Sequence, residues 1–318
     1  MIDVLTIGSG TVDHFLTVEQ PLSTAKVGDK ILVKSMEMHS GGGATNVAAG
    51  LARLGIRVNV LVKLGSDHDA EFVLKELRKY NVRYLPLPPS RNSTDSSTII
   101  YSTIEKDRII FVHKGASQDL RVADIHHSSF QARWVYLGSL MGTAFAAAKE
   151  VARHSRRKNI PLLFNPSLYL AKKGVAYLKP ILSATTLLIF NKEEAQALLN
   201  STADTTTLLK RLRGLGLPMM VITDGPRRLY ALNGNTIYAY LPPKVKIVDT
   251  TGAGDAFTSG LLAGILKGYS FKDALRLGQV NSLAVIQKVG TKGNLLGEQE
   301  ARKWMGKLRI KVHLGKIP

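Results

Sequence analysis

The sequence predicts an α/β fold with a mostly parallel central sheet. Short apolar runs rich in β-branched residues alternate with longer segments of helical period, which is typical of parallel strands joined by crossover helices. Several strands end in polar residues, and ligands bind at that edge in open α/β sheets. The expected strands are DVLTIG (3–8), VNVLVKLG (58–65), WVYLGS (134–139), IPLLFN (160–165), TLLIFN (186–191) and PMMVITDG (218–225), with helices expected over 43–55, 70–80 and 143–159.

Two stretches break this alternation and look like paired strands outside the main sheet. The stretch 97–115 reads as a hairpin with its turn near Lys106 and Asp107, and KILVKSMEMHSGG (30–42) is a strand that leads into a triple glycine. No linker or internal repeat divides the chain. We therefore expect residues 1–318 to form a single catalytic domain with a small β-sheet lid, built within about 12–38 and 96–114. Such a lid can cover a ligand or form a dimer contact.

The composition excludes several classes of protein. The chain of 318 residues has no cysteine, which rules out disulfides, thiolate metal sites and cysteine nucleophiles. No apolar run is long enough to span a bilayer, so we expect a cytoplasmic protein with no membrane partner. The net charge of +19 is spread along the chain without a zinc-finger or ribonucleoprotein motif. We interpret it as a solvated basic surface rather than a nucleic-acid interface.

One short motif, GAGD (252–255), combines the elements of an anion site and stands directly before an apolar run of helical period. Gly252 and Gly254 let successive backbone amides point at one spot, and amides at a helix start attract an anion. Asp255 is placed to accept the proton of an attacking hydroxyl if a phosphoryl group is transferred there. The alternative is structural: Asp255 complements the helix dipole and one of the two preceding threonines caps the helix.

Several motifs together resemble the ribokinase-like, or phosphofructokinase-B, family of carbohydrate kinases. DTTGAGDAFTSGLLAGIL (249–266) resembles its C-terminal signature, and SGGGATNVAAGLARLG (40–55) resembles its N-terminal signature. Further similarity runs through GSGTVD, LVKLGSD, LIFNKEEA, VITDG and ALRLGQVNSLAVIQKVG, so the match covers essentially the whole chain. The resemblance implies a ribokinase-like three-layer αβα sandwich with a β-sheet lid. It also implies ATP-dependent phosphorylation of a hydroxymethyl group on a sugar or nucleoside.

The resemblance assigns roles to the GAGD residues that agree with the local argument. Asp255 matches the catalytic base of the family, and the backbone of Gly252, Ala253 and Gly254 matches its anion hole.

For the acceptor, the resemblance implies a substrate site near the N-terminus. Asp13, expected at the end of the first strand, matches an aspartate that binds substrate hydroxyls, and a carboxylate can accept two such hydrogen bonds. Gly42, Gly43 and Asn46 match a substrate-contacting glycine turn and the amide that follows it. The alternatives are a tight turn for the glycines and a helix cap for Asn46.

For the nucleotide, the resemblance implies a site at the ends of the later strands. Asn191 and Glu194, one helical turn apart, match a motif that organises magnesium and phosphate through water, although a surface helix start uses the same residue types. Thr223 and Gly225 match a nucleotide-contacting turn, and Asn281 matches a position that approaches the adenine. The implied cofactors are ATP and Mg²⁺.

One further match to the family and two departures from its pattern complete the resemblance. Asp249 and Thr251 match positions that often hold a monovalent cation such as K⁺, and the alternative is capping of the turn. Arg227 and Arg228 follow TDG where the family often has a second glycine, so these arginines either reach a phosphate or project into solvent. The first signature also reads GGGATN rather than GGKGAN, so ribose is not favoured as the acceptor.

The main hypothesis is therefore a kinase that phosphorylates a sugar, polyol or sugar acid. A nucleoside kinase has the same chemistry and stands second, and it requires an apolar slot for the base. Lys114 and His113 follow the hairpin and leave a phosphosugar acceptor open. A binding protein without catalysis is disfavoured, because an inactive pocket needs none of the matched site residues as a set. Oligomeric state stays open between a homodimer formed through the lid and a monomer.

Overall fold

A mostly parallel sheet runs through residues 2–307 and 313–316, the part of the chain that the computed structural model describes. Within it the ten strands are β1 (Ile2–Gly8), β4 (Val58–Val62), β5 (Arg83–Tyr84), β8 (Ala132–Leu137), β9 (Leu162–Phe164), β10 (Leu187–Asn191), β11 (Met219–Thr223), β12 (Leu229–Asn233), β13 (Thr236–Tyr240) and β14 (His313–Lys316). Their order is β14-β13-β12-β11-β10-β9-β8-β1-β4-β5. The pairings from β11 to β5 are parallel, and β12, β13 and β14 add antiparallel at one edge.

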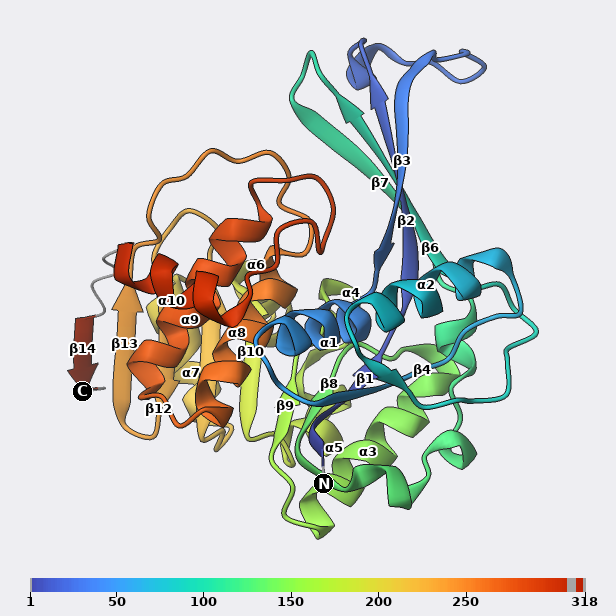
Figure 1. Cartoon of the computed structure of the whole chain (residues 1–318). Coiled ribbons are helices and arrows are strands. Elements are labelled where there is room, and N and C mark those ends of the chain that lie inside the picture. The colour runs from blue at the N-terminus through green and yellow to red at the C-terminus, as the bar shows by residue number, and fades with distance from the viewer. Residues whose placement is uncertain (1, 308–312, 317–318) are drawn as a thin grey trace.

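Helices cover both faces of this sheet (Figure 1). One face packs against α1 (Gly43–Arg53), α2 (His68–Lys79), α8 (Ala253–Leu266), α9 (Phe271–Val285) and α10 (Glu298–Lys307). The other packs against α3 (Phe145–Arg157), α4 (Leu168–Ala171), α5 (Gly174–Leu182), α6 (Lys192–Leu199) and α7 (Thr205–Arg213). The central strands read as continuous apolar runs because both of their faces are buried. The predicted α/β sandwich is confirmed.

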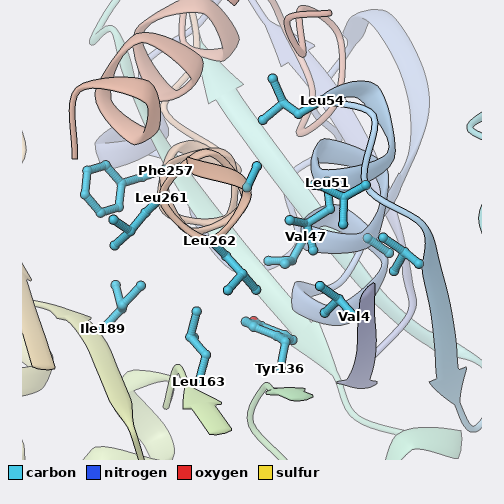
Figure 2. Packing of buried hydrophobic residues seen from close by; sticks show 14 of the residues in the cluster. Val4, Val47, Leu51, Leu54, Tyr136, Leu163, Ile189, Phe257, Leu261 and Leu262 are labelled. Carbon is cyan, nitrogen blue, oxygen red and sulfur yellow. The ribbon is translucent and has the colours of Figure 1, made fainter. Parts of the chain in front are cut away.

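Small residues bring α8 close to its two neighbouring helices. A β-carbon on Gly260 would lie 2.7 Å from the carbonyl oxygen of Leu277, and one on Gly264 would lie 2.7 Å from the Cα atom of Ala274. On the other side, Gly50 of α1 faces Ser259, whose Oγ would lie 2.2 Å from such an added atom. Figure 2 shows the apolar side chains of α1 and α8 meeting over the sheet. The N-terminus of α8 is therefore held in a fixed position at the carboxyl edge of the sheet.

A separate sheet of four strands projects from this edge (Figure 1). It has the order β3-β2-β6-β7 and consists of β2 (Thr11–Val18), β3 (Val33–Gly41), β6 (Asp95–Ser102) and β7 (Asp107–His113). The hairpin expected from the sequence is present and consists of β6 and β7. Lys106, in the turn between these strands, has a φ of 55°. The predicted β lid is confirmed. None of the helices in the described ranges is long and apolar enough to cross a membrane.

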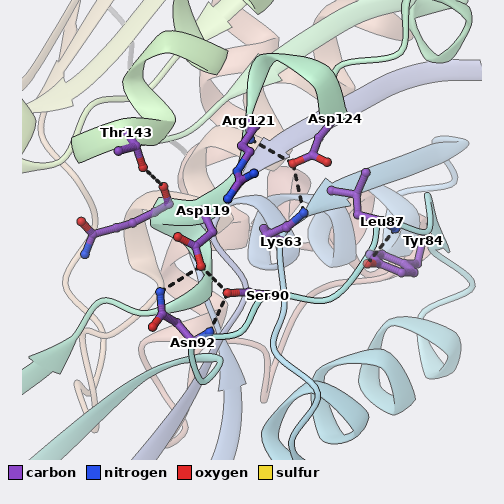
Figure 3. A network of polar contacts seen from close by, with 10 residues as sticks. Lys63, Tyr84, Leu87, Ser90, Asn92, Asp119, Arg121, Asp124 and Thr143 are labelled. Carbon is purple, nitrogen blue, oxygen red and sulfur yellow. Dashed lines mark hydrogen bonds and ion pairs between the residues drawn. The ribbon is translucent and has the colours of Figure 1, made fainter.

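A polar network fastens the segment after β7 to the body of the protein (Figure 3). Lys63 Nζ lies 3.1 Å from Asp124 Oδ2 in a buried ion pair. Asn92 Nδ2 donates to Asp119 Oδ2 at 2.9 Å, and Thr143 Oγ1 donates to the carbonyl oxygen of Gln118. Because these bonds surround residues 116–119, the wall that this segment presents to the neighbouring cavity is well fixed.

Candidate active site

A cavity of about 420 Å³ opens at the carboxyl edge of the sheet, beneath the lid. Its walls come from the ends of several strands, from the start of α1 and from the turn before α8, and they include Gly43, Tyr136, Asn165, Asn191, Thr223 and Asp255. This is the edge at which the polar strand ends predicted a ligand.

Asp255 lies in the first turn of α8 and is held by the N-terminal half of the chain. Asn46 Nδ2 donates to Asp255 Oδ2 at 2.8 Å, across 209 residues of sequence. Asn46 is itself buried, and its Oδ1 accepts a hydrogen bond from Thr291 Oγ1 at 3.0 Å. Because both the nitrogen and the oxygen of the side-chain amide are hydrogen-bonded, the orientation of Asn46 is fixed. The carboxylate of Asp255, which Asn46 bonds, is held in place by the same contacts.

Burial raises the pKa of Asp255 to about 6, and the charge of Asp13 adds to this effect. The hydrogen bond from Asn46 and the charge of Lys292 act in the opposite direction and limit the rise in pKa. The carboxylate is therefore largely ionised at neutral pH but more basic than an ordinary aspartate. These properties suit a general base.

The helix that carries Asp255 begins without a side-chain cap. Gly252 is the N-cap residue and has a φ of 79°, a left-handed conformation that favours glycine. A β-carbon there would also lie 2.7 Å from the Cα atom of Thr291. Neither Thr250 nor Thr251 caps the helix. The Ala253 amide donates to the carbonyl oxygen of Thr250 at 3.3 Å, whereas the amides of Gly254 and Asp255 have no side-chain partner among the described residues, and both residues line the cavity. The positive end of the helix favours an anion there.

The glycine turn before α1 forms the floor of the same cavity. Gly42 has a φ of 94°, and a β-carbon on it would lie 2.5 Å from the carbonyl oxygen of Ser9. Gly43 lines the cavity, and a β-carbon on it would lie 3.8 Å from Asp255 Oδ1. The two glycines thus have different uses: Gly42 makes the turn, and Gly43 leaves space beside Asp255.

Asp13 does not end the first strand of the main sheet as expected. The strand β1 ends at Gly8, and after two residues the chain enters β2, so Asp13 is the third residue of a lid strand. Its buried carboxylate accepts hydrogen bonds from Thr11 Oγ1, at 3.2 Å, and from Ser97 Oγ. Asp13 is not among the residues that line the main cavity, although its charge reaches Asp255.

Asn191 and Glu194 form a closed capping box at the start of α6. Asn191 Oδ1 accepts from the Glu194 amide at 2.8 Å, and Glu194 Oε2 accepts from the Asn191 amide at 2.8 Å. Burial raises the pKa of Glu194 to about 7, with smaller contributions from the charges of Asp255 and Glu193. Both residues of the box also line the cavity, so they serve the helix and face the site together.

A second hollow of about 340 Å³ adjoins the first, because Asn191 and Thr223 line both. Gly225, with a φ of 54°, forms part of its wall. Arg227 Nη2 donates to Asp224 Oδ1 at 2.5 Å, so this guanidinium is paired with a carboxylate of its own turn. Arg228 is exposed.

The structure places Asn281 away from both hollows. Its side chain is fully buried, with Nδ2 donating to the carbonyl oxygen of Ala256 at 2.9 Å and Oδ1 accepting from the Leu296 amide at 3.1 Å. It thus ties α9 to α8 and to the chain that follows. The expectation that Asn281 approaches a nucleotide is therefore corrected: its polar atoms are used within the protein core.

Asp249 and Thr251 lie together in the loop before α8. Asp249 Oδ1 accepts from the Thr251 amide at 3.0 Å and from its hydroxyl at 2.7 Å, and Asp249 Oδ2 accepts from the Gly290 amide at 3.1 Å. Arg108 of the lid lies 3.5 Å from Asp249 Oδ1. Within the described ranges, no group of three or more histidine, aspartate or glutamate side chains is arranged to hold a metal ion.

Two residues at the site were not predicted from the sequence. Tyr136 lies within an apolar strand, where nothing distinguishes it from a core residue, yet it lines the cavity. Lys292 is buried, and its Nζ donates to the carbonyl oxygen of Ser40 at 2.5 Å and to Ser40 Oγ at 3.0 Å. Burial lowers the pKa of Lys292 to about 8. The only sequence signal for Lys292 is its place directly after the last motif, in GTKG.

The chain combines a three-layer fold, a β lid, a helix start without a side-chain cap and a carboxylate of raised pKa, and it is a phosphotransferase that acts on alcohol groups. Residues 1–296 match the pfkB family of carbohydrate kinases, and the chain belongs to this family. It is a sugar or nucleoside kinase of the ribokinase type.

Similar proteins span nearly the whole chain. The ribokinase of Bacillus subtilis is 26% identical over 304 residues, which cover 95% of this chain and 99% of that protein. A carbohydrate kinase from Agrobacterium tumefaciens has a similar structure, with a TM-score of 0.83, 23% identity, and 99% and 100% of the two chains covered. A nucleoside kinase from Methanocaldococcus jannaschii has a TM-score of 0.79 and 21% identity, with 97% and 99% covered. Sugar and nucleoside kinases thus share this fold.

Proposed function

We propose that this protein transfers the γ-phosphoryl group of ATP to a hydroxyl of a sugar or related polyol, with Asp255 as the base. One observation carries the proposal: Asn46 fixes Asp255 at 2.8 Å inside a cavity, beside a helix start that has no side-chain cap. We treat residues 1–318 as one kinase unit, with the four-stranded sheet as its lid.

In the proposed mechanism, ATP when bound supplies the phosphoryl group that is transferred. Asp255 accepts the proton of the acceptor hydroxyl as that oxygen attacks, and its raised pKa makes it a better proton acceptor than an ordinary aspartate. The backbone amides of Gly252, Ala253 and Gly254 stabilise the charge that builds on the transferred group. Asn46 keeps the carboxylate oriented during the proton transfer.

The hollow beside Asn191, Thr223 and Gly225 fits the nucleotide, because it is continuous with the cavity at Asp255. The partly buried carboxylate of Glu194 has no cationic partner within hydrogen-bonding distance among the described residues, and we propose that it supports Mg²⁺ through water.

At Asp249 and Thr251, the negative charge of the aspartate is already balanced by Arg108. We therefore expect K⁺ to change activity only weakly, which turnover with and without K⁺ measures.

The polar side chains that line the cavity favour a polyhydroxylated compound as the acceptor. We propose that Gly43 and Asp13 belong to the acceptor site. The runner-up is a nucleoside kinase, because Val112, Met141 and Tyr169 give the cavity an apolar side where a base could stack. Lys114 also lines the cavity, but its Nζ lies 3.4 Å from the buried Asp95. This pairing weakens the case for a phosphosugar.

We also propose a cytoplasmic homodimer formed through the lid. The face of the lid turned away from the cavity exposes a group of large apolar side chains, among them Met36, Met38, Ile109 and Phe111. An apolar group of this kind on a projecting sheet is typical of an interface. Sedimentation of the wild type and of Phe111→Lys tests this: the wild type should sediment as a dimer and the variant should shift toward monomer.

The test of the proposed activity is a panel of sugars, polyols, sugar acids, sugar phosphates and nucleosides, each supplied with ATP and Mg²⁺ and scored by ADP release. We expect turnover with at least one sugar or polyol. Turnover confined to nucleosides would favour the runner-up, and no turnover with any member would contradict the proposal.

A further inference from the structure

Tyr136 sits beneath the cavity with its ring and its hydroxyl in different surroundings. The residue lies near the carboxyl end of β8 and is 1% exposed. Its ring belongs to the apolar layer that contains Leu163 and Val4 (Figure 2). Its side chain nevertheless lines the cavity at Asp255. The ring is therefore a core group, while the hydroxyl at its tip meets the cavity.

The hydroxyl of Tyr136 has no hydrogen-bond partner among the described residues, and it is not one of the fully enclosed unpaired polar atoms, so it opens onto the cavity. Tyr240 provides the comparison within the same chain. It is also fully buried, and its hydroxyl lies 3.4 Å from the carbonyl oxygen of Leu275 and 3.2 Å from Gln279 Oε1. The Tyr136 hydroxyl differs from that of Tyr240 because it can bond water or a molecule bound in the cavity.

Residue 43 is a glycine, and its lack of a side chain leaves space next to the Tyr136 hydroxyl. A β-carbon on Gly43 would lie 3.1 Å from the Tyr136 hydroxyl and 3.8 Å from Asp255 Oδ1. These two distances place the Tyr136 hydroxyl and Asp255 Oδ1 less than about 7 Å apart, a span that two hydroxyls of one bound molecule can bridge. Burial and the negative charges of Asp255 and Glu194 raise the pKa of Tyr136 well above its usual value, so the phenol stays protonated and can donate.

We propose that Tyr136 is a specificity-determining residue, whose hydroxyl binds a second hydroxyl of the acceptor, distinct from the one that is phosphorylated. The inference rests on the proposed function and deepens it, because it requires an acceptor with at least two hydroxyl groups that enter the cavity. A site built to bond a hydroxyl discriminates strongly against the analogue that lacks it, since the buried partner is then left unpaired.

The test compares Tyr136→Phe with the matched control Tyr240→Phe. The acceptors are D-ribose with 2-deoxy-D-ribose, D-fructose with 1-deoxy-D-fructose, and adenosine with its 2′- and 3′-deoxy forms. For the acceptor that the wild type prefers, Tyr136→Phe should lower kcat/KM roughly tenfold, mainly through a higher KM, with KM for ATP unchanged. For the deoxy analogue that lacks the bonded hydroxyl, wild type and Tyr136→Phe should be equal. Tyr240→Phe should lose stability and keep acceptor preference.

Each possible result of this comparison either supports or overturns the role of Tyr136. The wild type could turn over while Tyr136→Phe loses the same factor in kcat/KM on the preferred acceptor and on all its deoxy analogues. This result would overturn the inference and leave the proposed function standing. An unchanged kcat/KM for Tyr136→Phe would do the same. No turnover by the wild type on any acceptor would overturn the proposed function itself, and the inference with it.

Gly43→Ala gives a second, independent test of the same contact. Gly43 does not have a positive φ, so alanine fits the backbone, and its methyl group would cover the Tyr136 hydroxyl. We expect weaker binding of the preferred acceptor. The double variant with Tyr136→Phe should be no worse than Gly43→Ala alone, whereas additive losses would contradict a shared contact.

Discussion

Two helices start at the same edge of the sheet and differ in how their first turn is satisfied. At α6, Asn191 and Glu194 close a capping box with two hydrogen bonds of 2.8 Å. At α8, the N-cap is Gly252 and no side chain bonds the first turn. A helix start that its own chain leaves open, at an edge where ligands bind, is available to an anion. The comparison therefore separates a helix start that is closed by its own side chains from one that is not.

The carboxylates divide differently, because Glu194 of the capped helix α6 groups with Asp255. Asp255 and Glu194 border the cavity, and burial raises the pKa of the first to about 6 and of the second to about 7. Asp204 caps α7 on the surface, and its hydrogen bonds from Thr206 and Thr207 lower its pKa to about 2. Ionised carboxylates at the cavity thus lack full compensation, whereas the surface cap is fully bonded. Perturbation of this kind is typical of functional sites.

The largest effect is expected from Asp255→Asn, which keeps the shape of the side chain and removes the proton acceptor. We expect kcat to fall by roughly 10³ or more, because general bases contribute about 10² to 10⁴. Nucleotide binding, measured by calorimetry, should persist. Asp204→Asn is the control at a capped helix, and it should keep its kcat. Undiminished turnover by Asp255→Asn would contradict the assignment of the base.

Glu194→Gln asks whether the capping box at α6 also serves the reaction. Glutamine can still close a capping box, so the unfolding midpoint should change little. The lost charge should lower kcat roughly 10²-fold and raise the Mg²⁺ concentration needed for half-maximal rate. Measuring rate against Mg²⁺ at fixed ATP checks this. If rate and Mg²⁺ dependence both stay as in the wild type, α6 is only structural.

The pH dependence of kcat/KM sharpens the role of the Asn46–Asp255 pair. The rate should rise with pH through about 6, since Asp255 must be ionised to accept a proton. Asn46→Ala removes a hydrogen bond that lowers this pKa, so the acid limb should move upward by roughly one unit and cost about fivefold in rate at pH 6. An acid limb at the same pH in both enzymes would show that a different group titrates.

The sequence predicted the sheet and the lid, because periodicity and turn signals set these features, and the family resemblance implied that the GAGD turn and the N-terminal glycines serve one site. It gave Asp13 two incompatible places, the end of the first strand and the expected lid range of about 12–38, and the strand pairing shows that Asp13 lies in the lid. It assigned Asn281 to the nucleotide, whereas packing between α8 and α9 uses its amide in the core. Tyr136 and Lys292 depend on contacts between distant segments, which no local pattern reveals.

The smallest effect is expected from Asp204→Ala, at the capped start of α7. The Asp204 carboxylate accepts from the Thr207 amide at 2.9 Å, so its loss should lower Tm by a few degrees at pH 7 and leave kcat unchanged. Because folding lowers this pKa from 3.8 to about 2, the stabilisation is complete above about pH 4 and is lost as pH falls toward 2. The difference in Tm between the two proteins should therefore shrink between pH 4 and pH 2. A constant difference would mean that the cap acts through packing rather than through the charge of Asp204.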